Sequence, residues 1–204
     1  MKRYIMIIVA VFLIILDIRI PTMAYPAFET FKTEAPETLE LIIQHVVGSR
    51  LRIDLLPDVA GYILLAVSAV QLLAENEKFR KTILWSAAGL GIYVFQNIMP
   101  FWLNGNERFR VGYLIYFVGA FLEAAAVLEG VYPICGKLNC IENRSYNNAT
   151  IIILLISVGT GFVWKALWFF DLTLLSVIYL LVQIVTMGIC WYRIFQNKKL
   201  LLGQ

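Results

Sequence analysis

Long, mainly apolar stretches recur along this chain, and they constrain its fold more than any other feature. A bilayer core about 30 Å thick needs about 20 apolar residues in each helix that crosses it. Six stretches meet or approach this length: Tyr4–Ile20, Leu55–Ala74, Thr82–Trp102, Val111–Pro133, Ala149–Phe170 and Leu172–Tyr192. The sequence therefore predicts an all-α polytopic membrane protein, with six transmembrane helices in a single domain over residues 1–204.

The amino-acid composition agrees with a membrane location. Of the 204 residues, 60% are hydrophobic and only 15% are Asp, Glu, Lys or Arg, whereas soluble domains have about 45–50% apolar and about 25% charged residues. These proportions exclude a secreted soluble protein, a disordered tail and a nucleic-acid-binding domain. The chain has one histidine, His45, which excludes bis-histidine haem and multi-histidine metal sites. The three cysteines show no metal-binding spacing, so we expect no cofactor.

The distribution of Lys and Arg predicts the orientation, because these residues favour the cytoplasmic side of a membrane. Ten of them lie near the two termini and in the connections 75–81 and 134–148, six lie in residues 19–54 and 103–110, and Lys165 lies within a span. We therefore expect both termini in the cytoplasm. One feature favours the opposite side for residues 134–148: this connection contains two Asn-x-Ser/Thr sequons and two cysteines, which in an outer loop would suggest a glycan and a disulfide.

The first outer connection, about residues 21–54, is far longer than a connection between helices needs to be. Within it, five apolar residues recur at helical spacing and form one stripe: Leu39, Ile42, Ile43, Val46 and Val47. We expect an outer amphipathic helix over residues 37–47. It is either an anchor in the membrane interface or a lid over an outward-facing polar cavity.

Two ionisable residues within the apolar stretches are candidates for a site, because charged groups are costly inside a membrane. Glu123 shares a helical seam with small residues and one tyrosine: Gly112, Tyr116, Gly119, Ala126 and Gly130. Lys165 shares a similar seam with Ser157, Gly161 and Trp168. Small residues let neighbouring helices approach closely, so both charges should face the bundle interior. The side chains lean toward a common depth, and we expect them to meet, as a structural ion pair or as a solute site.

A second group of charged and aromatic residues lies near the outer ends of the predicted spans. Asp17, Asp58, Arg110 and Trp168 belong to it and could line an outer vestibule. The alternative for Asp58 is local, since a carboxylate in the first turn of a helix interacts favourably with the helix dipole, with Asp54 as the N-cap. Trp102 and Trp164 fall at the same level, where an aromatic belt is usual. The candidate ligand-binding residues are thus Glu123, Lys165, Asp58, Asp17, Arg110 and Trp168, with no catalytic or metal residue.

The segment RIDLLPDVAGYILL resembles an Asp-hydrophobic-Leu-Pro-Asp-x-x-Gly-Tyr segment of small, uncharacterised multi-span membrane proteins of Firmicutes. The matching residues are Asp54, Leu56, Pro57, Asp58, Gly61 and Tyr62. In its predicted topology, the chain is also similar to the substrate-binding components of energy-coupling-factor vitamin transporters, which have six spans and a first loop that closes over the ligand. The resemblances imply a multi-pass protein of the bacterial plasma membrane.

These features favour a small-solute-binding or transport component as the function. The competing hypothesis is a non-catalytic subunit or assembly factor of a larger membrane complex, and a third is an intramembrane enzyme that uses carboxylates. No serine, cysteine or zinc protease pattern and no phosphate-binding loop occurs in the sequence, so an enzyme is the less favoured class. The expected partners are the lipid bilayer and either a small-molecule ligand or other membrane subunits.

Overall fold

The computed structural model describes residues 2–16, 19–24, 50–54, 58–98, 105–138, 144–169 and 172–196. In chain order these residues form α1 (Lys2–Ile15), β1 (Arg19–Ala24), β2 (Arg50–Asp54), α4 (Asp58–Leu72), α5 (Phe79–Ile98), α6 (Gly105–Leu138), α7 (Arg144–Phe169) and α8 (Thr173–Gln196). Each predicted apolar stretch corresponds to one of the helices. The prediction of a helical protein is therefore confirmed over the described part of the chain.

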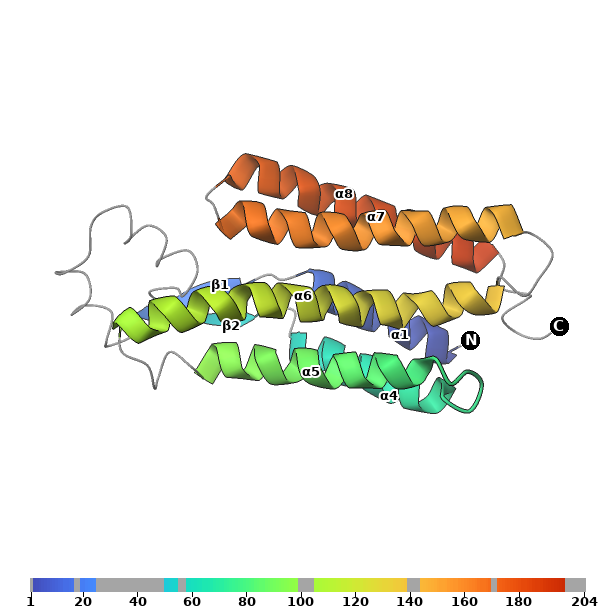
Figure 1. Ribbon diagram of the computed structural model, residues 1–204, viewed down its shortest axis with the longest axis horizontal. Coiled ribbons are helices and arrows are strands. Elements are labelled where there is room, and N and C mark those ends of the chain that lie inside the picture. Colours follow the sequence, from blue (N-terminus) through green and yellow to red (C-terminus); the bar gives the residue numbers. More distant parts are fainter. Residues whose placement is uncertain are drawn as a thin grey trace.

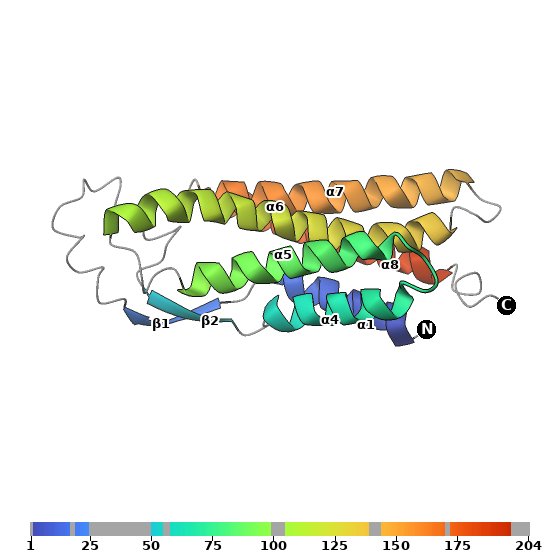
Figure 2. The same ribbon diagram turned by 60° about the horizontal axis from the view of Figure 1, so that its bottom comes forward.

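The helices run side by side along the long axis of the molecule and alternate in direction (Figure 1). Helices α7 and α8 form a hairpin on one side, α6 lies in the middle, and α1, α4 and α5 lie on the other side (Figures 1 and 2). Helix α6 contacts both α5 and α7, whereas α8 packs mainly on α7. Helix α6 therefore joins the α7–α8 hairpin to the rest of the bundle.

The centre of the bundle is apolar and closely packed. Ile7 and Ile14 of α1, Leu65 of α4 and Ile134 of α6 are completely buried. Gly61 of α4 allows the closest approach, since a Cβ atom at this position would lie 2.8 Å from Ile14 Cγ1 and 3.1 Å from the carbonyl oxygen of Ala10. Helices α1 and α4 can pack at this distance only because residue 61 has no side chain.

Three of the described helices are long and apolar enough to cross a membrane, fewer than the six predicted. Their apolar parts are Leu114–Cys135 of α6, Asn148–Leu167 of α7 and Leu174–Gln196 of α8. Helices α1 and α4 are apolar but shorter, with 14 and 15 residues. Helix α5 has 20 residues but is not among the three. The predicted span Tyr4–Ile20 is too long, because the helix ends at Ile15 and Arg19 already belongs to β1.

The outward faces of α7 and α8 are also apolar. Exposed residues on these faces include Ile152, Leu155, Ile156, Leu174, Leu181, Val185 and Ile189. A helix that is hydrophobic all round belongs in a large core or in a membrane. In the described part of the chain these side chains are exposed, which is compatible with contact to lipid.

A two-stranded antiparallel ribbon forms the two described ends of the long connection between α1 and α4. Strands β1 and β2 pair Arg19 with Asp54, Ile20 with Ile53 and Pro21 with Arg52, and the register shifts before Ala24. The sequence analysis predicts no strands at the two ends of this connection, and the expected helix over 37–47 lies outside the described residues. Asp54 is not the N-cap of α4, since it ends β2 and the helix begins at Asp58.

Pro133 lies inside α6 and leaves a backbone carbonyl without its usual donor. Proline has no N–H, so the carbonyl four residues earlier, on Glu129, loses its intrahelical hydrogen bond. The buried hydroxyl of Thr82 on α5 donates a hydrogen bond to this carbonyl. Asn76 Nδ2 donates to the carbonyl of Pro133 itself at 3.5 Å. Polar side chains from the α4–α5 turn and from α5 therefore make the proline tolerable in α6.

Candidate functional site

Glu123 of α6 and Lys165 of α7 form an ion pair between the two helices. Lys165 Nζ donates to Glu123 Oε2. Glu123 is 9% exposed and Lys165 is 8% exposed, so most of the pair is removed from solvent. The predicted contact between these two residues is confirmed.

Small buried residues share the helical seams of the two charges. Ala126 and Ser157 are completely buried. Gly119 and Gly161 are buried as well: a Cβ atom on Gly119 would overlap the amide of Gln96 on α5, and one on Gly161 would overlap the amide of Gln183 on α8. The spacing of small residues along each helix therefore turns both charges inward, as we predicted from the sequence.

The indole of Trp164 lies beside the lysine. Lys165 Nζ is 5.4 Å from the centroid of the Trp164 ring, a distance at which an ammonium group is attracted to an aromatic face. Trp164 is buried, and its Nε1 donates a 2.8 Å hydrogen bond to Gln183 Oε1 of α8. Trp164 therefore faces the interior of the bundle, with its polar atom bound to α8.

Further hydrogen bonds fix the helices around the pair. The Tyr116 hydroxyl of α6 donates to the backbone carbonyl of Lys165 at 2.8 Å. Ser157 Oγ donates to the backbone carbonyl of Gln183 at 3.1 Å. Gln96 Nε2 of α5 donates to the carbonyl of Ile115 at 3.1 Å. Gln96 and Gln183 thus have the interhelical role expected of amides in apolar helices.

The structure describes the remaining predicted site residues only in part. Asp58 is 2% exposed and is the first residue of α4, which agrees with its expected position near the helix dipole. Asp17 lies outside the described residues. Arg110 and Trp168 belong to α6 and α7, but their side chains lie outside the described part. Among the predicted site residues, the structure brings Glu123 and Lys165 together.

The interface between α6 and α7 is the candidate site, which we define as Glu123, Lys165, Trp164, Tyr116 and Gln183. It offers two carboxylate oxygens that accept hydrogen bonds, an ammonium group that donates them, and an aromatic face. The two formal charges cancel. Where side chains are described, no group of three or more His, Cys, Asp or Glu could hold a metal ion. The chemistry of the site is thus electrostatic and hydrogen-bonding.

Sequence reasoning missed Trp164 and Tyr116 as neighbours of the lysine. The signal for Trp164 was present, because Ser157, Gly161 and Trp164 recur at helical spacing on one face of α7. The contact of Tyr116 with the carbonyl of Lys165 depends on which helices pack together, which spacing alone does not reveal. No protein-family model, curated protein or solved structure matches the chain.

Proposed function

We propose that this protein is a small-solute-binding or transport component of the bacterial plasma membrane, and that Glu123 and Lys165 are its solute site. The observation that supports this proposal is the buried ion pair. Glu123 lies near the middle of the apolar part of α6, Leu114–Cys135, where an ionisable group is most costly. Apolar residues of similar volume are often as stable as a buried ion pair, or more so. A role in solute binding explains why the chain contains charges here.

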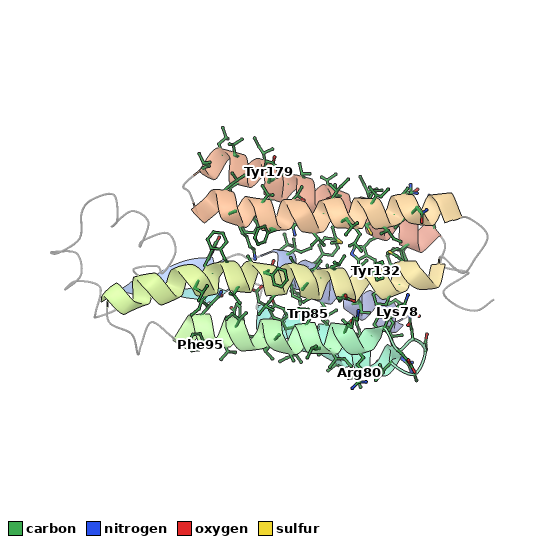
Figure 3. All side chains as sticks on the ribbon, in the orientation of Figure 1. Lys78, Arg80, Trp85, Phe95, Tyr132 and Tyr179 are labelled. Atoms are coloured by element: carbon green, nitrogen blue, oxygen red, sulfur yellow. The ribbon has the colours of Figure 1, made fainter. Side chains whose placement is uncertain are left out.

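The membrane topology is part of the same proposal. All six helices cross or enter the membrane, with α1, α4 and α5 completed by residues beyond their apolar parts. Helix α1 begins and α8 ends at the same end of the bundle (Figure 1), as an even number of crossings requires. The larger share of Lys and Arg at this end supports a cytoplasmic location of both termini. The described residues at this end of the bundle include Arg3, Lys78, Arg80 and Arg193. Lys78 Nζ lies 5.7 Å from the centroid of the Tyr132 ring (Figure 3).

The orientation is tested by labelling single cysteines placed at Glu37 and Asn143 in intact cells. A membrane-impermeant maleimide should modify the cysteine at position 37 from outside, and that at position 143 only after the membrane is opened. This result follows because residue 37 belongs to the predicted outer connection and residue 143 to a predicted inner one. Labelling of position 143 in intact cells would reverse the orientation.

The Asp-Leu-Leu-Pro-Asp segment at residues 54–58 supports a relation to the small Firmicutes membrane proteins that it resembles. The predicted six-span topology with a long first outer connection supports a functional similarity to the substrate-binding components of energy-coupling-factor transporters. The described ends of this connection are β1 and β2, which pair with each other after α1 and before α4.

Solute binding is tested with the full chain in lipid nanodiscs. The thermal denaturation midpoint is measured with a panel of small charged, zwitterionic and neutral solutes. The matched control is the double variant Glu123→Gln/Lys165→Met, which removes both charges without leaving one unpaired. A solute that stabilises the wild type and not the double variant supports the proposal. Equal stabilisation of both proteins, or none of either, refutes it.

A non-catalytic subunit of a larger membrane complex is the second candidate function. It is favoured by the apolar outer face of α8, which packs mainly on α7 and leaves Leu174, Leu181 and Val185 exposed. Chemical cross-linking in the native membrane distinguishes contact of this face with lipid from contact with a partner helix. A partner cross-linked through α8, together with no solute effect in nanodiscs, supports the subunit.

A further inference from the structure

The surface where α5 meets α6 bears exposed basic residues at one end of the bundle. Lys78, in the turn between α4 and α5, has its ammonium group 5.7 Å from the centroid of the Tyr132 ring of α6 (Figure 3). Lys81 follows one turn later, and its backbone N–H donates to the Lys78 carbonyl at 3.1 Å. Both lysines are exposed. Two ammonium groups therefore lie on the surface within one helical turn of each other.

Neither lysine is neutralised by a carboxylate in the described part of the chain. The described carboxylates at this end of the bundle are those of Glu75, Glu77 and Glu129. Within that part, Lys78 and Lys81 form no ion pair with any of them. Glu75 lies 3.5 Å from Arg3 of α1 instead. The positive charge of the two lysines is therefore available to a ligand outside the bundle.

The position of Lys78 is fixed by its neighbours in the turn. Asn76 Oδ1 accepts a hydrogen bond from the backbone N–H of Lys78 at 3.0 Å, and Asn76 Nδ2 donates to the carbonyl of Pro133 at 3.5 Å. Phe79, the next residue, is 2% exposed and anchors the turn in the apolar core. The turn is thus tied to α6, and the Lys78 ammonium group is held beside Tyr132.

This ammonium group lies at the depth where lipid headgroups are expected. The apolar part of α6 ends at Cys135, so Tyr132 lies within one turn of its end. Tyrosine is enriched at this level of a membrane, where its ring lies among the acyl chains and its hydroxyl near the headgroups. The Tyr132 side chain is exposed, and Lys78 lies over its ring. Both groups can therefore reach the phosphate of a lipid.

Toward the middle of the bundle, the same surface is apolar and aromatic. Four residues of α6 follow one another at helical spacing, and none of them is fully buried: Phe121, Ala125, Leu128 and Tyr132. Trp85 of α5, one turn beyond Lys81, contacts Phe121 edge to face, with the ring centroids 6.1 Å apart (Figure 3). The rise from Tyr132 to Phe121 is about 16 Å, about the hydrocarbon depth of one leaflet. An acyl chain below the lysines would lie along these residues.

We propose that Lys78, Lys81 and Tyr132 bind the headgroup of an anionic phospholipid whose acyl chain lies against Trp85 and Phe121. The lipid phosphate accepts hydrogen bonds from the two ammonium groups and the tyrosine hydroxyl. The net negative charge of the lipid compensates the lysines, which a zwitterionic lipid does not do. This inference is independent of the proposed solute binding and requires only that the bundle lies in a bilayer.

The test is native mass spectrometry of the full chain, released from detergent micelles that contain equal amounts of phosphatidylglycerol and phosphatidylcholine. The two lipids carry the same acyl chains, so that they differ only in the headgroup. The wild type should retain one phosphatidylglycerol in preference to phosphatidylcholine. A basic residue near an anionic headgroup contributes a factor of about 5 in affinity, so the preference should be about 25-fold for the two lysines.

Three variants, each of which removes one positive charge, locate the binding site. Lys78→Gln and Lys81→Gln should each lower the preference for phosphatidylglycerol about 5-fold. Arg80→Gln is the matched control, because Arg80 is exposed in the same turn but points away from α6 (Figure 3). This control should keep the preference of the wild type. Circular dichroism in phosphatidylcholine nanodiscs checks that each variant has the helix content of the wild type.

Equal retention of the two lipids by the wild type overturns the proposal. An equal loss of preference in Arg80→Gln and in the lysine variants also overturns it, because the lipid would then respond to the total charge of this end of the bundle. A preference that persists in both lysine variants shows that the lipid binds elsewhere, which overturns it as well. The proposed solute site uses neither lysine, so each of these results leaves it intact.

Discussion

Neutralising one partner of the Glu123–Lys165 pair should destabilise the protein strongly, and neutralising both should restore much of the loss. The single variants Glu123→Gln and Lys165→Met each leave one charge buried without its partner. The double variant leaves none. Comparing the unfolding free energy of the double variant with those of the two single variants therefore gives the interaction free energy between Glu123 and Lys165.

The burial of the pair sets the size of this effect. The side chains of Lys165 and Glu123 are 10% and 12% exposed, whereas those of Arg3 and Glu75, the ion pair between α1 and the end of α4, are 53% and 37% exposed. Breaking a buried pair costs about 3–5 kcal/mol, and an exposed pair contributes about 0.2–1 kcal/mol. Each single variant at the buried pair should lose about 3–5 kcal/mol, and Glu75→Gln, the matched control, no more than about 1 kcal/mol.

The free energy of unfolding can be measured by titration with sodium dodecyl sulfate in mixed micelles, followed by circular dichroism. A double variant that recovers at least half of the single-variant loss agrees with the reasoning. A loss below about 1 kcal/mol for both single variants, equal to that of the exposed control, would show that the pair is solvated. Strict additivity in the double variant would show that the two residues do not interact.

Two further predictions concern how the helices pack, and both are measured in the same unfolding assay. Thr82→Val removes the buried hydroxyl that donates to the Glu129 carbonyl and should cost about 1–3 kcal/mol of unfolding free energy. In a Pro133→Ala background, where the backbone donor returns, the same substitution should cost much less. Equal costs in both backgrounds would contradict the proposed role of the threonine. Gly61→Ala places a Cβ atom against α1 and should lower the free energy of unfolding by about 1–3 kcal/mol. The control Gly159→Ala, at a position where a Cβ atom has no neighbour within 4 Å, should be nearly neutral. A larger effect at Gly159 than at Gly61 would refute the packing argument.

The contact between Glu123 and Lys165 could be predicted from the sequence because it depends on local spacing. Small residues three and four positions from each charge identify the face of each helix that packs against another. Side chains lean toward the N-terminus of their own helix, so the two charged groups were predicted to meet at one depth in the membrane. Both inferences use a single helix at a time.

The ribbon of β1 and β2 was missed although its sequence contains a signal. Arg50, Leu51, Arg52, Ile53 and Asp54 alternate between polar and apolar residues, the period of a strand. The interpretation of Asp54 as a helix cap hid this alternation. The partner strand had no such pattern, because it contains Pro21, and the long intervening connection gave no indication that the two segments pair.

The link from Thr82 to the carbonyl opposite Pro133 could not be predicted, because it depends on which helix lies beside α6. A proline in an apolar helix shows that a carbonyl has lost its donor, but not which side chain replaces it. Fewer of the described helices than predicted are long and apolar enough to cross a membrane. Apolar stretches were counted together with flanking residues such as Arg19, which the structure places in β1.

The most direct test of the account is a nitroxide scan of α7 in lipid nanodiscs, residue by residue from 148 to 167. Collision rates with oxygen, which dissolves in lipid, and with a water-soluble nickel chelate distinguish lipid, water and protein contacts. The account predicts oxygen maxima at the exposed positions Ile152, Leu155 and Phe162, minima at Ser157 and Lys165, and low nickel rates through the middle of the helix. High nickel rates at the exposed positions would contradict a membrane location, and an oxygen maximum at Lys165 would contradict the buried pair.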